Sequence, residues 1–545
     1  MIHADLALIN GKIVTMDKSH TIAQAVATKW GRILAVGTDE DIKQHIGAET
    51  HVIDLLGRTV IPGMIDTHCH MIATGISNTT DIDLGEEAGV RSIADLKKRI
   101  AEKAIQAKPG EWVTGVREDD QKLAEKRHPD RFDLDQAAPD NPVIVSTVGG
   151  HYYIANTQAL RKAGITRETP DPVGGVIERD KQGEPTGGLH EKALELVTAA
   201  KARAKEGASS DDAREEAIEG VKRILQSNAS TGLTCVYDMV DGVQLRTVLD
   251  LKNRGSLPIR VRMDVEIALQ PELDILGITQ GLGDEFARIC GLKFFFDGAV
   301  SARTAAVAEA YNDRPGYMGV LSTTREIAHK TILEAVRRGH RVSAHANGER
   351  AITMYLDIIA EAQAKYPRPD SRNRVIHCSV LTPDLVNRIR KLGLLPTIFG
   401  PYPYYHGDKL IPAFGPERLE RMFAARWLLD AGIRVAAHSD HDASPYPPLM
   451  AIHALVNRRT RTGKPLGQSQ RISVTEALSL YTSNAAYHSF DENDLGSIES
   501  GKLADMVILG RDLLTAPSET IKDIPVDATI MGGRIIHERT GQQSS

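Results

Sequence analysis

The sequence predicts a (β/α)8 barrel with extra strands at both ends of the chain and a large insertion after the first barrel strand. Three observations predict this fold. Eight short apolar segments alternate with segments of helical spacing through the middle of the 545-residue chain, and such alternation favours a parallel sheet that eight units can close into a barrel. Both ends are rich in short strand patterns. The gap between the first two apolar segments is far too long for one crossover.

Both ends of the chain carry strand patterns of the same kind. Each consists of short apolar runs joined by glycine turns, and these patterns lie at residues 5–14, 32–37, 504–509 and 528–536. We expect them to form one small β-sandwich from residues 1–62 and 490–545, which leaves residues 63–489 for the barrel.

The barrel strands are predicted from apolar segments, most of which end in a polar or charged residue. They are residues 59–66, 232–238, 258–266, 291–297, 341–345, 374–377, 394–399 and 433–440. Segments of helical spacing, such as 327–338 and 383–392, lie between them. The 32 residues from His345 to His377 match the length of one βαβ unit.

An insertion is predicted between the first two barrel strands, at about residues 77–211. It contains a helical pattern at 92–108, a strand-like run at 142–146, and a glycine- and proline-rich stretch at 170–188.

Composition and charge exclude several classes of protein. The net charge is -6 and no basic run is present, which argues against a nucleic-acid partner. No segment approaches the ~20 apolar residues of a membrane span, and no signal-peptide pattern begins the chain. The four cysteines show no CxxC spacing, as expected of a reduced, cytoplasmic protein. No motif encodes the oligomeric state, and a homodimer is the default expectation.

Metal-ligand residues end several of the predicted strands. His68 and His70 are two residues apart, so in a strand both side chains point to one face. His345, His377 and Asp440 each end a later strand. Imidazoles and carboxylates are the ligands of a catalytic zinc or a similar ion, and a barrel builds its site at the strand C-termini. A lone His-x-His pair is weak evidence, but the joint pattern favours a metal site.

These motifs together resemble a known family. The matching segments are residues 62–70, Lys293 with Asp297-Gly298 and Arg303, residues 345–351, His377, Ser439-Asp440, Ala485, residues 495–505 and, in the insertion, Gly149-Gly150-His151. The chain resembles the amidohydrolase superfamily, specifically amidohydrolase family 3, which contains N-substituted formamide deformylases and YtcJ-like proteins. The resemblance runs nearly from end to end.

The resemblance implies one or two divalent metal ions, with zinc the first expectation and manganese, iron or cobalt as alternatives. His68, His70 and Asp440 would hold the more buried ion, and His345 and His377 the second. A cationic Lys293 would be repelled by such a cluster, whereas Lys293 carboxylated by carbon dioxide would bridge the two ions. The implied catalytic residues are Asp440, His377 and Lys293.

Other residues are predicted to contact the substrate. Tyr402, Tyr404 and His406 lie in the predicted loop after the seventh strand and offer an aromatic, hydrogen-bonding wall. His151 in the insertion is predicted to reach over the site, with a structural hydrogen bond as the alternative role. His438 departs from the family pattern, in which a glycine is more usual, and His441 follows closely. Substrate contact is our slightly preferred role for these two imidazoles, with simple filling of the pocket as the alternative.

The sequence thus predicts a hydrolase that uses metal-activated hydroxide to cleave an amide-type carbon–nitrogen bond of a small molecule. An N-substituted formamide, an N-acyl amine and a small cyclic amide are the open substrate classes. Asp440 would accept the proton and return it to the leaving nitrogen. The alternative is a mononuclear deaminase of a heterocyclic amine, with Glu349 as proton shuttle. A third hypothesis, a catalytically inactive scaffold, is disfavoured because none of the expected ligands is missing.

Overall fold

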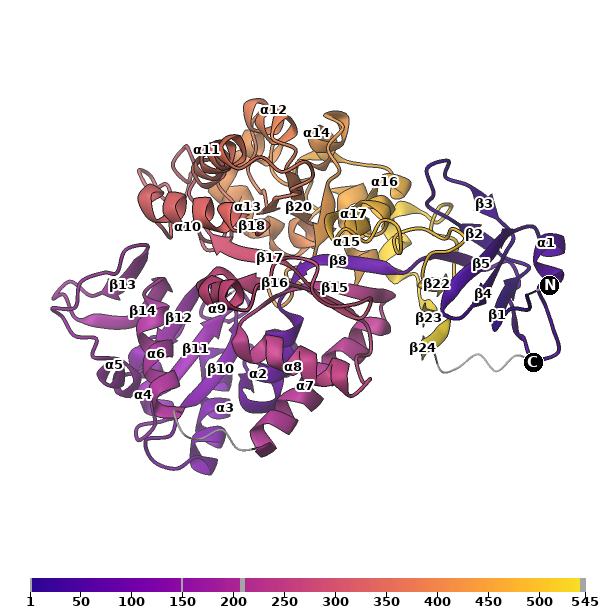
Figure 1. Ribbon diagram of the computed structural model, residues 1–545. Helices are drawn as coiled ribbons and strands as arrows, with labels where there is room; N and C mark the ends of the chain where they lie inside the picture. The colour runs from indigo at the N-terminus through magenta and orange to yellow at the C-terminus, as the bar shows by residue number, and fades with distance from the viewer. Residues whose placement is uncertain (1, 149, 206–210, 540–545) are drawn as a thin grey trace.

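The structure is a computed structural model that describes residues 2–148, 150–205 and 211–539. Gly149, within the predicted insertion, and residues 206–210, near its predicted end, lie outside the described residues. Residues 1 and 540–545, within the ranges predicted for the β-sandwich, do so as well. Figure 1 shows the barrel in the upper centre, the terminal strands to its right and the insertion below it to the left. Within the described chain, no helix combines the length and apolar character that crossing a lipid bilayer requires.

An eight-stranded parallel sheet forms a TIM-like barrel, as the sequence predicts. Each barrel strand pairs with the next one along the chain, in the order β8 (Met64–Cys69), β15 (Leu233–Val240), β16 (Arg260–Glu266), β17 (Ala287–Phe295), β18 (Val342–Ala346), β19 (Arg374–His377), β20 (Leu395–Phe399) and β21 (Ala436–His438). Helices alternate with them: α2 (Met71–Thr80), α7 (Asp211–Ala229), α8 (Gly242–Asn253), α9 (Gln270–Ile275), α10 (Arg325–Arg337), α11 (Glu349–Lys365), α12 (Pro383–Lys391), α13 (Tyr402–Leu419), α14 (Ala425–Asp430), α15 (Pro448–Asn457), α16 (Val474–Leu480) and α17 (Ser483–His488).

The seam between β8 and β21 closes the barrel without a regular strand ladder. The Thr67 hydroxyl donates a hydrogen bond to the Ala437 carbonyl at 2.8 Å. Just beyond β21, the Asp440 N–H donates to the His68 carbonyl at 3.1 Å. The first and last barrel strands are therefore held together close to the predicted metal ligands.

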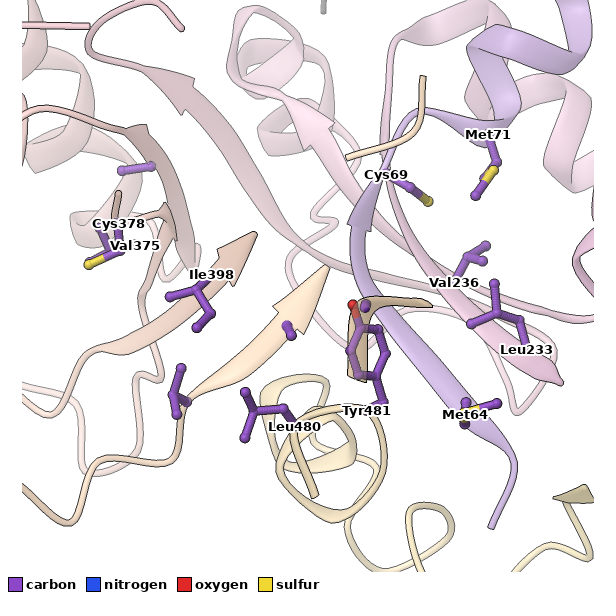
Figure 2. Packing of buried hydrophobic residues seen from close by; sticks show 14 of the residues in the cluster. Met64, Cys69, Met71, Leu233, Val236, Val375, Cys378, Ile398, Leu480 and Tyr481 are labelled. Atoms are coloured by element: carbon purple, nitrogen blue, oxygen red, sulfur yellow. The ribbon is translucent and has the colours of Figure 1, made fainter. Parts of the chain in front are cut away.

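The barrel core lies between the strands and the surrounding helices. Figure 2 shows Met64 on β8, Leu233 and Val236 on β15, and Tyr481 after α16 within one buried cluster. The start of α12 follows from its local sequence. Thr382 directly precedes Pro383, and its side chain accepts a hydrogen bond from the Leu385 N–H. This bond satisfies a backbone donor that would otherwise be unpaired at the helix start.

The predicted first barrel strand, 59–66, is split in the structure, so its predicted bounds were wrong. Its first half is β7 (Thr59–Pro62), which belongs to a sheet of terminal strands, and its second half is β8 of the barrel. Gly63 makes the change of sheet, and a Cβ there would lie 2.3 Å from the Thr234 hydroxyl. The apolar run continues across the junction, and so its pattern does not reveal the break.

The terminal strands form two sheets. One has the order β5 (Arg32–Gly37), β4 (Ala25–Lys29), β1 (Leu6–Ile9) and β6 (His51–Asp54), with α1 (Asp39–Lys43) following β5 in the chain. The other has the order β24 (Arg534–Glu538), β23 (Val526–Met531), β22 (Met506–Leu509), β7, β2 (Lys12–Val14) and β3 (Ile22–Ala23). Leu8 and Val26 of the first sheet share one buried cluster with Ile508 and Ile530 of the second.

The insertion contains a six-stranded sheet of its own, where the sequence predicted a single strand. Its order is β13 (Gly175–Arg179), β14 (Pro185–Glu191), β12 (Tyr152–Ala155), β11 (Val143–Thr147), β10 (Val113–Glu118) and β9 (Ile82–Asp83). Its helices are α3 (Ile93–Gln106), α4 (Arg131–Ala137), α5 (Thr157–Ala163) and α6 (Leu194–Lys205). The predicted 142–146 strand is β11, and the glycine-rich stretch forms most of the β13–β14 hairpin. Lys409 of α13 pairs with Asp119 at 2.6 Å and ties the insertion to the barrel.

We expect Gly63→Ala to destabilise the fold, because the new methyl group has no room between Thr234 and Asp505. Overpacking of this kind costs about 1–3 kcal/mol, measurable as a lower midpoint of urea or thermal unfolding. Gly242→Ala is the matched control, because the nearest atom to its new methyl group is 3.9 Å away. Unchanged stability of Gly63→Ala would contradict the close packing at this junction.

Candidate metal centre and active site

Six predicted site residues gather at the C-terminal ends of the barrel strands. His68 lies in β8 with His70 just beyond it, and Asp440 lies two residues beyond β21. Lys293, His345 and His377 lie at or near the ends of β17, β18 and β19. Because the C-termini of parallel strands meet at one face of a barrel, residues distant in sequence converge there.

His68, His70 and Asp440 form the first group of metal donors. One ligand atom from each lies within 4.8 Å of the others. The Asp440 Oδ1 atom lies 3.2 Å from the His68 Nε2 atom and 3.4 Å from the His70 Nε2 atom. The structure therefore brings together the three residues predicted for the more buried ion.

The environment of Asp440 Oδ1 fits a cation. This oxygen is buried and takes part in no properly aligned hydrogen bond, although two imidazole nitrogens lie within 3.4 Å of it. Electron-rich atoms that face one another without a shared proton repel, and a divalent ion between them removes that repulsion. Two imidazoles and one carboxylate are a donor set that zinc and similar ions accept, with a position left open for catalysis.

Lys293 is fully buried beside the first donor group. Its Nζ atom lies 3.1 Å from the His68 Nε2 atom, and no carboxylate in the described chain forms an ion pair with it. Burial lowers the pKa of Lys293 to about 7, although the charge of Asp440 acts to raise it. The amine is therefore readily deprotonated near neutral pH, which carboxylation by carbon dioxide requires.

His345 and His377 lie side by side, with the His345 Nδ1 atom 3.0 Å from the His377 Nε2 atom. Burial holds the pKa of each ring well below the usual value, so both imidazoles are neutral. The other ring nitrogen of His345 faces the Gly298 carbonyl at 3.3 Å and the Asn347 amide at 3.1 Å.

A second group of donors consists of His377, His438 and Asp440, again with ligand atoms within 4.8 Å of one another. His345 belongs to neither three-residue group in the described chain. Burial lowers the pKa of His438 to about 3, so this ring is neutral as well.

A cavity of about 20 Å³ adjoins the cluster. His151, Tyr402 and His406 line it, together with His345, His377, Asp440 and the residues Val148, Ala299, Val300, Ser301, Asn347, Phe399 and Ala443. The Ser301 N–H donates to the Tyr402 hydroxyl at 3.2 Å. A larger hollow of about 1010 Å³ lies against the terminal strands, but no histidine lines it.

Two of the predicted substrate-binding residues do not line the cavity. The segment predicted as a loop after the seventh strand is the start of α13, so the loop prediction was wrong. Tyr402 and His406 are four residues apart and share one helix face, whereas Tyr404 points elsewhere and contacts the His453 ring, with centroids 5.8 Å apart. His441 also lies outside the cavity, and its Nδ1 atom contacts the Ser444 carbonyl at 3.2 Å.

The model of the amidohydrolase family matches residues 51–537 of the chain. The chain belongs to the amidohydrolase family. It is an enzyme, a metal-dependent hydrolase of carbon–nitrogen bonds other than peptide bonds, as the sequence predicts.

Individual relatives match almost the whole chain. The N-substituted formamide deformylase of Arthrobacter pascens is 29% identical, over 98% of this chain and 99% of its own. The putative amidohydrolase YtcJ of Bacillus subtilis (strain 168) is also 29% identical, over 97% of this chain and 99% of its own. The crystal structure of an uncharacterized metal-dependent hydrolase from Pyrococcus horikoshii OT3 has a TM-score of 0.75 and 26% identity, and covers 94% of this chain and 99% of its own.

His151 of this amidohydrolase reaches the cavity from the insertion, paired with a carboxylate that the sequence analysis missed. The His151 Nδ1 atom lies 2.9 Å from Glu191 Oε2, and the His151 ring is 5.2 Å from the His345 ring. Strands β12 and β14 are antiparallel, with Tyr152 opposite His190, which places the residues beside them, His151 and Glu191, together. Glu191 ends β14, just beyond the glycine- and proline-rich stretch, and carries no motif of its own.

Asp238 is a second buried carboxylate that the sequence analysis passed over. It lies in β15, fully buried. It accepts hydrogen bonds from the Ile72 N–H at 3.1 Å and the Cys69 thiol at 3.4 Å. The signal was available, because the predicted second strand ends at this aspartate as the metal-ligand strands end at theirs.

Glu349, the predicted proton shuttle of the deaminase alternative, does not line the cavity. Its carboxylate accepts from the Ala308 N–H at 3.1 Å and pairs with Arg421 at 3.2 Å. Glu349, the first residue of α11, therefore holds the loop after β17 against the helix. It is not positioned to act as an acid in the cavity.

Proposed function

We propose that this amidohydrolase cleaves the amide-type bond of a small N-substituted formamide or N-acyl amine. The observation that carries the proposal is the position of Asp440, the one carboxylate among the described residues that line the cavity, with the His68 and His70 nitrogens converging on it. The Arthrobacter pascens relative, named for formamide deformylation, supports a formamide as the first substrate to test.

His68, His70 and Asp440 would hold one divalent ion, for which zinc is our first choice. His345 and His377 are the predicted holders of a second ion, with carboxylated Lys293 as bridge. A bound divalent ion supplies hydroxide at neutral pH and polarises the scissile carbonyl.

The chain's own residues move the proton and orient the amide. Asp440 accepts the proton of the attacking water and returns it to the leaving nitrogen, because its carboxylate is the available base in the cavity. Glu191 fixes the Nδ1 side of His151, which leaves the His151 Nε2 atom for the substrate's carbonyl oxygen. His377 would act by helping to hold an ion, and Tyr402 and His406 shape the wall against the acyl and amine groups.

The proposal is tested by product analysis on the zinc-loaded enzyme. N-phenylformamide and N-phenylacetamide form a matched pair of substrates, and adenine tests the deaminase alternative. We expect formate and aniline in equal amounts from the first substrate, with slower release of acetate from the second. Ammonia released from adenine, with no cleavage of either amide, would overturn the proposal in favour of deamination.

Asp440→Asn should lower kcat by about 10²–10⁴-fold, the usual contribution of a positioned acid–base group. The asparagine oxygen still offers a ligand atom, so the variant should retain most of its metal by elemental mass spectrometry. Asp442→Asn is the control in the same loop, because Asp442 does not line the cavity. Turnover of Asp440→Asn at the wild-type rate would contradict the role of Asp440.

Glu191→Gln should lower kcat/KM by about 10–100-fold, as expected when a charge-assisted hydrogen bond worth about 1.5–3 kcal/mol is lost. Glu178→Gln is a close control, because Glu178 pairs with His190 at 2.8 Å on the same hairpin outside the cavity. The double variant with His151→Gln should lose little more than His151→Gln alone. Additive losses would show that Glu191 acts independently of His151.

A further inference from the structure

We propose that the Tyr402 hydroxyl donates a hydrogen bond to the carbonyl oxygen of the substrate and stabilises the negative charge that develops on this oxygen. The inference rests on the proposed function, because it assumes that an amide carbonyl is attacked beside Asp440. It makes Tyr402 a catalytic residue as well as a part of the cavity wall. The proton stays on the tyrosine throughout, so the proton transfers assigned to Asp440 are unchanged.

The ring of Tyr402 is held in place by its neighbours. Tyr402 is the first residue of α13, just beyond the end of β20, and it is 2% exposed. Its ring lies 4.2 Å from the Phe399 ring, 4.3 Å from the His406 ring and 5.5 Å from the Phe423 ring, measured between centroids. A donor that is fixed in this way needs no reorganisation when charge develops on the substrate.

The hydroxyl of Tyr402 carries a hydrogen that has no acceptor. Its oxygen accepts the Ser301 N–H at 3.2 Å, and no described residue offers an acceptor for its own hydrogen within hydrogen-bonding distance. Because Tyr402 and Ser301 both line the cavity, the hydroxyl lies at the cavity wall. Burial raises the pKa of Tyr402, and the charge of Asp440 adds to the rise, so the group is a neutral donor at physiological pH.

Two other buried tyrosines show what is particular to Tyr402. The Tyr311 hydroxyl donates to the Ala305 carbonyl at 2.8 Å, so its hydrogen is already used. The Tyr481 hydroxyl has no partner in the described part of the chain, but Tyr481 belongs to the barrel core and does not line the cavity. Tyr402 combines an unused donor with a position where a substrate can reach it.

The carbonyl oxygen is the substrate atom that this donor fits best. In the proposed reaction Asp440 returns its proton to the leaving nitrogen, so the nitrogen already has a partner. The Nε2 atom of His406, beside Tyr402 on the same helix face, contacts the Ala443 carbonyl at 2.7 Å and is occupied. The carbonyl oxygen gains negative charge when water adds to the carbon. A fixed donor stabilises that charged state more than it stabilises the neutral amide.

Tyr402→Phe removes the hydroxyl and keeps the ring. In the zinc-loaded enzyme it should lower kcat for N-phenylformamide by about 100-fold, the lower end of the range for the loss of one oxyanion donor, with little change in KM. It should bind as many zinc ions as the wild type by elemental mass spectrometry. Tyr404→Phe is the matched control and should keep the wild-type kcat. Tyr404 lies on the same helix, but its ring contacts the His453 ring at 5.8 Å and does not line the cavity.

N-phenylacetamide separates a hydrogen bond from a role in shape. The same oxygen gains charge in both amides, so Tyr402→Phe should lower kcat by the same factor for both. A loss confined to KM, a loss of bound zinc, or a factor that depends on the acyl group would give Tyr402 a role in packing alone and overturn the inference.

The inference and the proposed function fail in different ways. An active wild type with an equally active Tyr402→Phe refutes the inference and leaves the proposed function standing. A wild type that cleaves neither amide refutes the proposed function, and the inference with it.

Discussion

The seam between β8 and β21 is the contact on which the rest of the site depends. It joins the first barrel strand to the last, almost the full length of the barrel apart in sequence, through the Thr67–Ala437 and Asp440–His68 hydrogen bonds. The same residues that close the barrel carry the donors of the first group. The hydrogen bonds that close the barrel at this seam therefore also hold His68 beside Asp440.

Asp440 belongs to both groups of metal donors, so two candidate ion positions share this one carboxylate. It lies within 4.8 Å of ligand atoms of His68 and His70 in one group and of His377 and His438 in the other. It is also the only described carboxylate that lines the cavity. A group that binds ions and moves protons must keep at least one oxygen accessible. Its side chain is 12% exposed, whereas His68 beside it is 1% exposed.

The barrel and the residues of its cluster were predictable because they obey local rules: strands with apolar runs, and ligands at strand ends. The split at Gly63 was not, since an unbroken apolar run conceals a change of sheet. Strands β10, β13 and β14 of the insertion sheet were missed because they contain glycine, which local patterns assign to loops. Strands β9 and β12 were missed because they are only two and four residues long. The pairing of His151 with Glu191 depends on antiparallel register, and register between distant strands is invisible in one sequence.

The cavity beside the cluster has another consequence. Its volume of about 20 Å³ holds little more than one water molecule, and an amide with an aromatic or alkyl substituent is many times larger. Val148 and His151 of the insertion form part of its wall, and the Lys409–Asp119 ion pair fastens the insertion to α13. An amide substrate therefore needs more room between the insertion and the barrel than this conformation offers, and the Lys409–Asp119 contact is one of those that decide how much room the insertion can give.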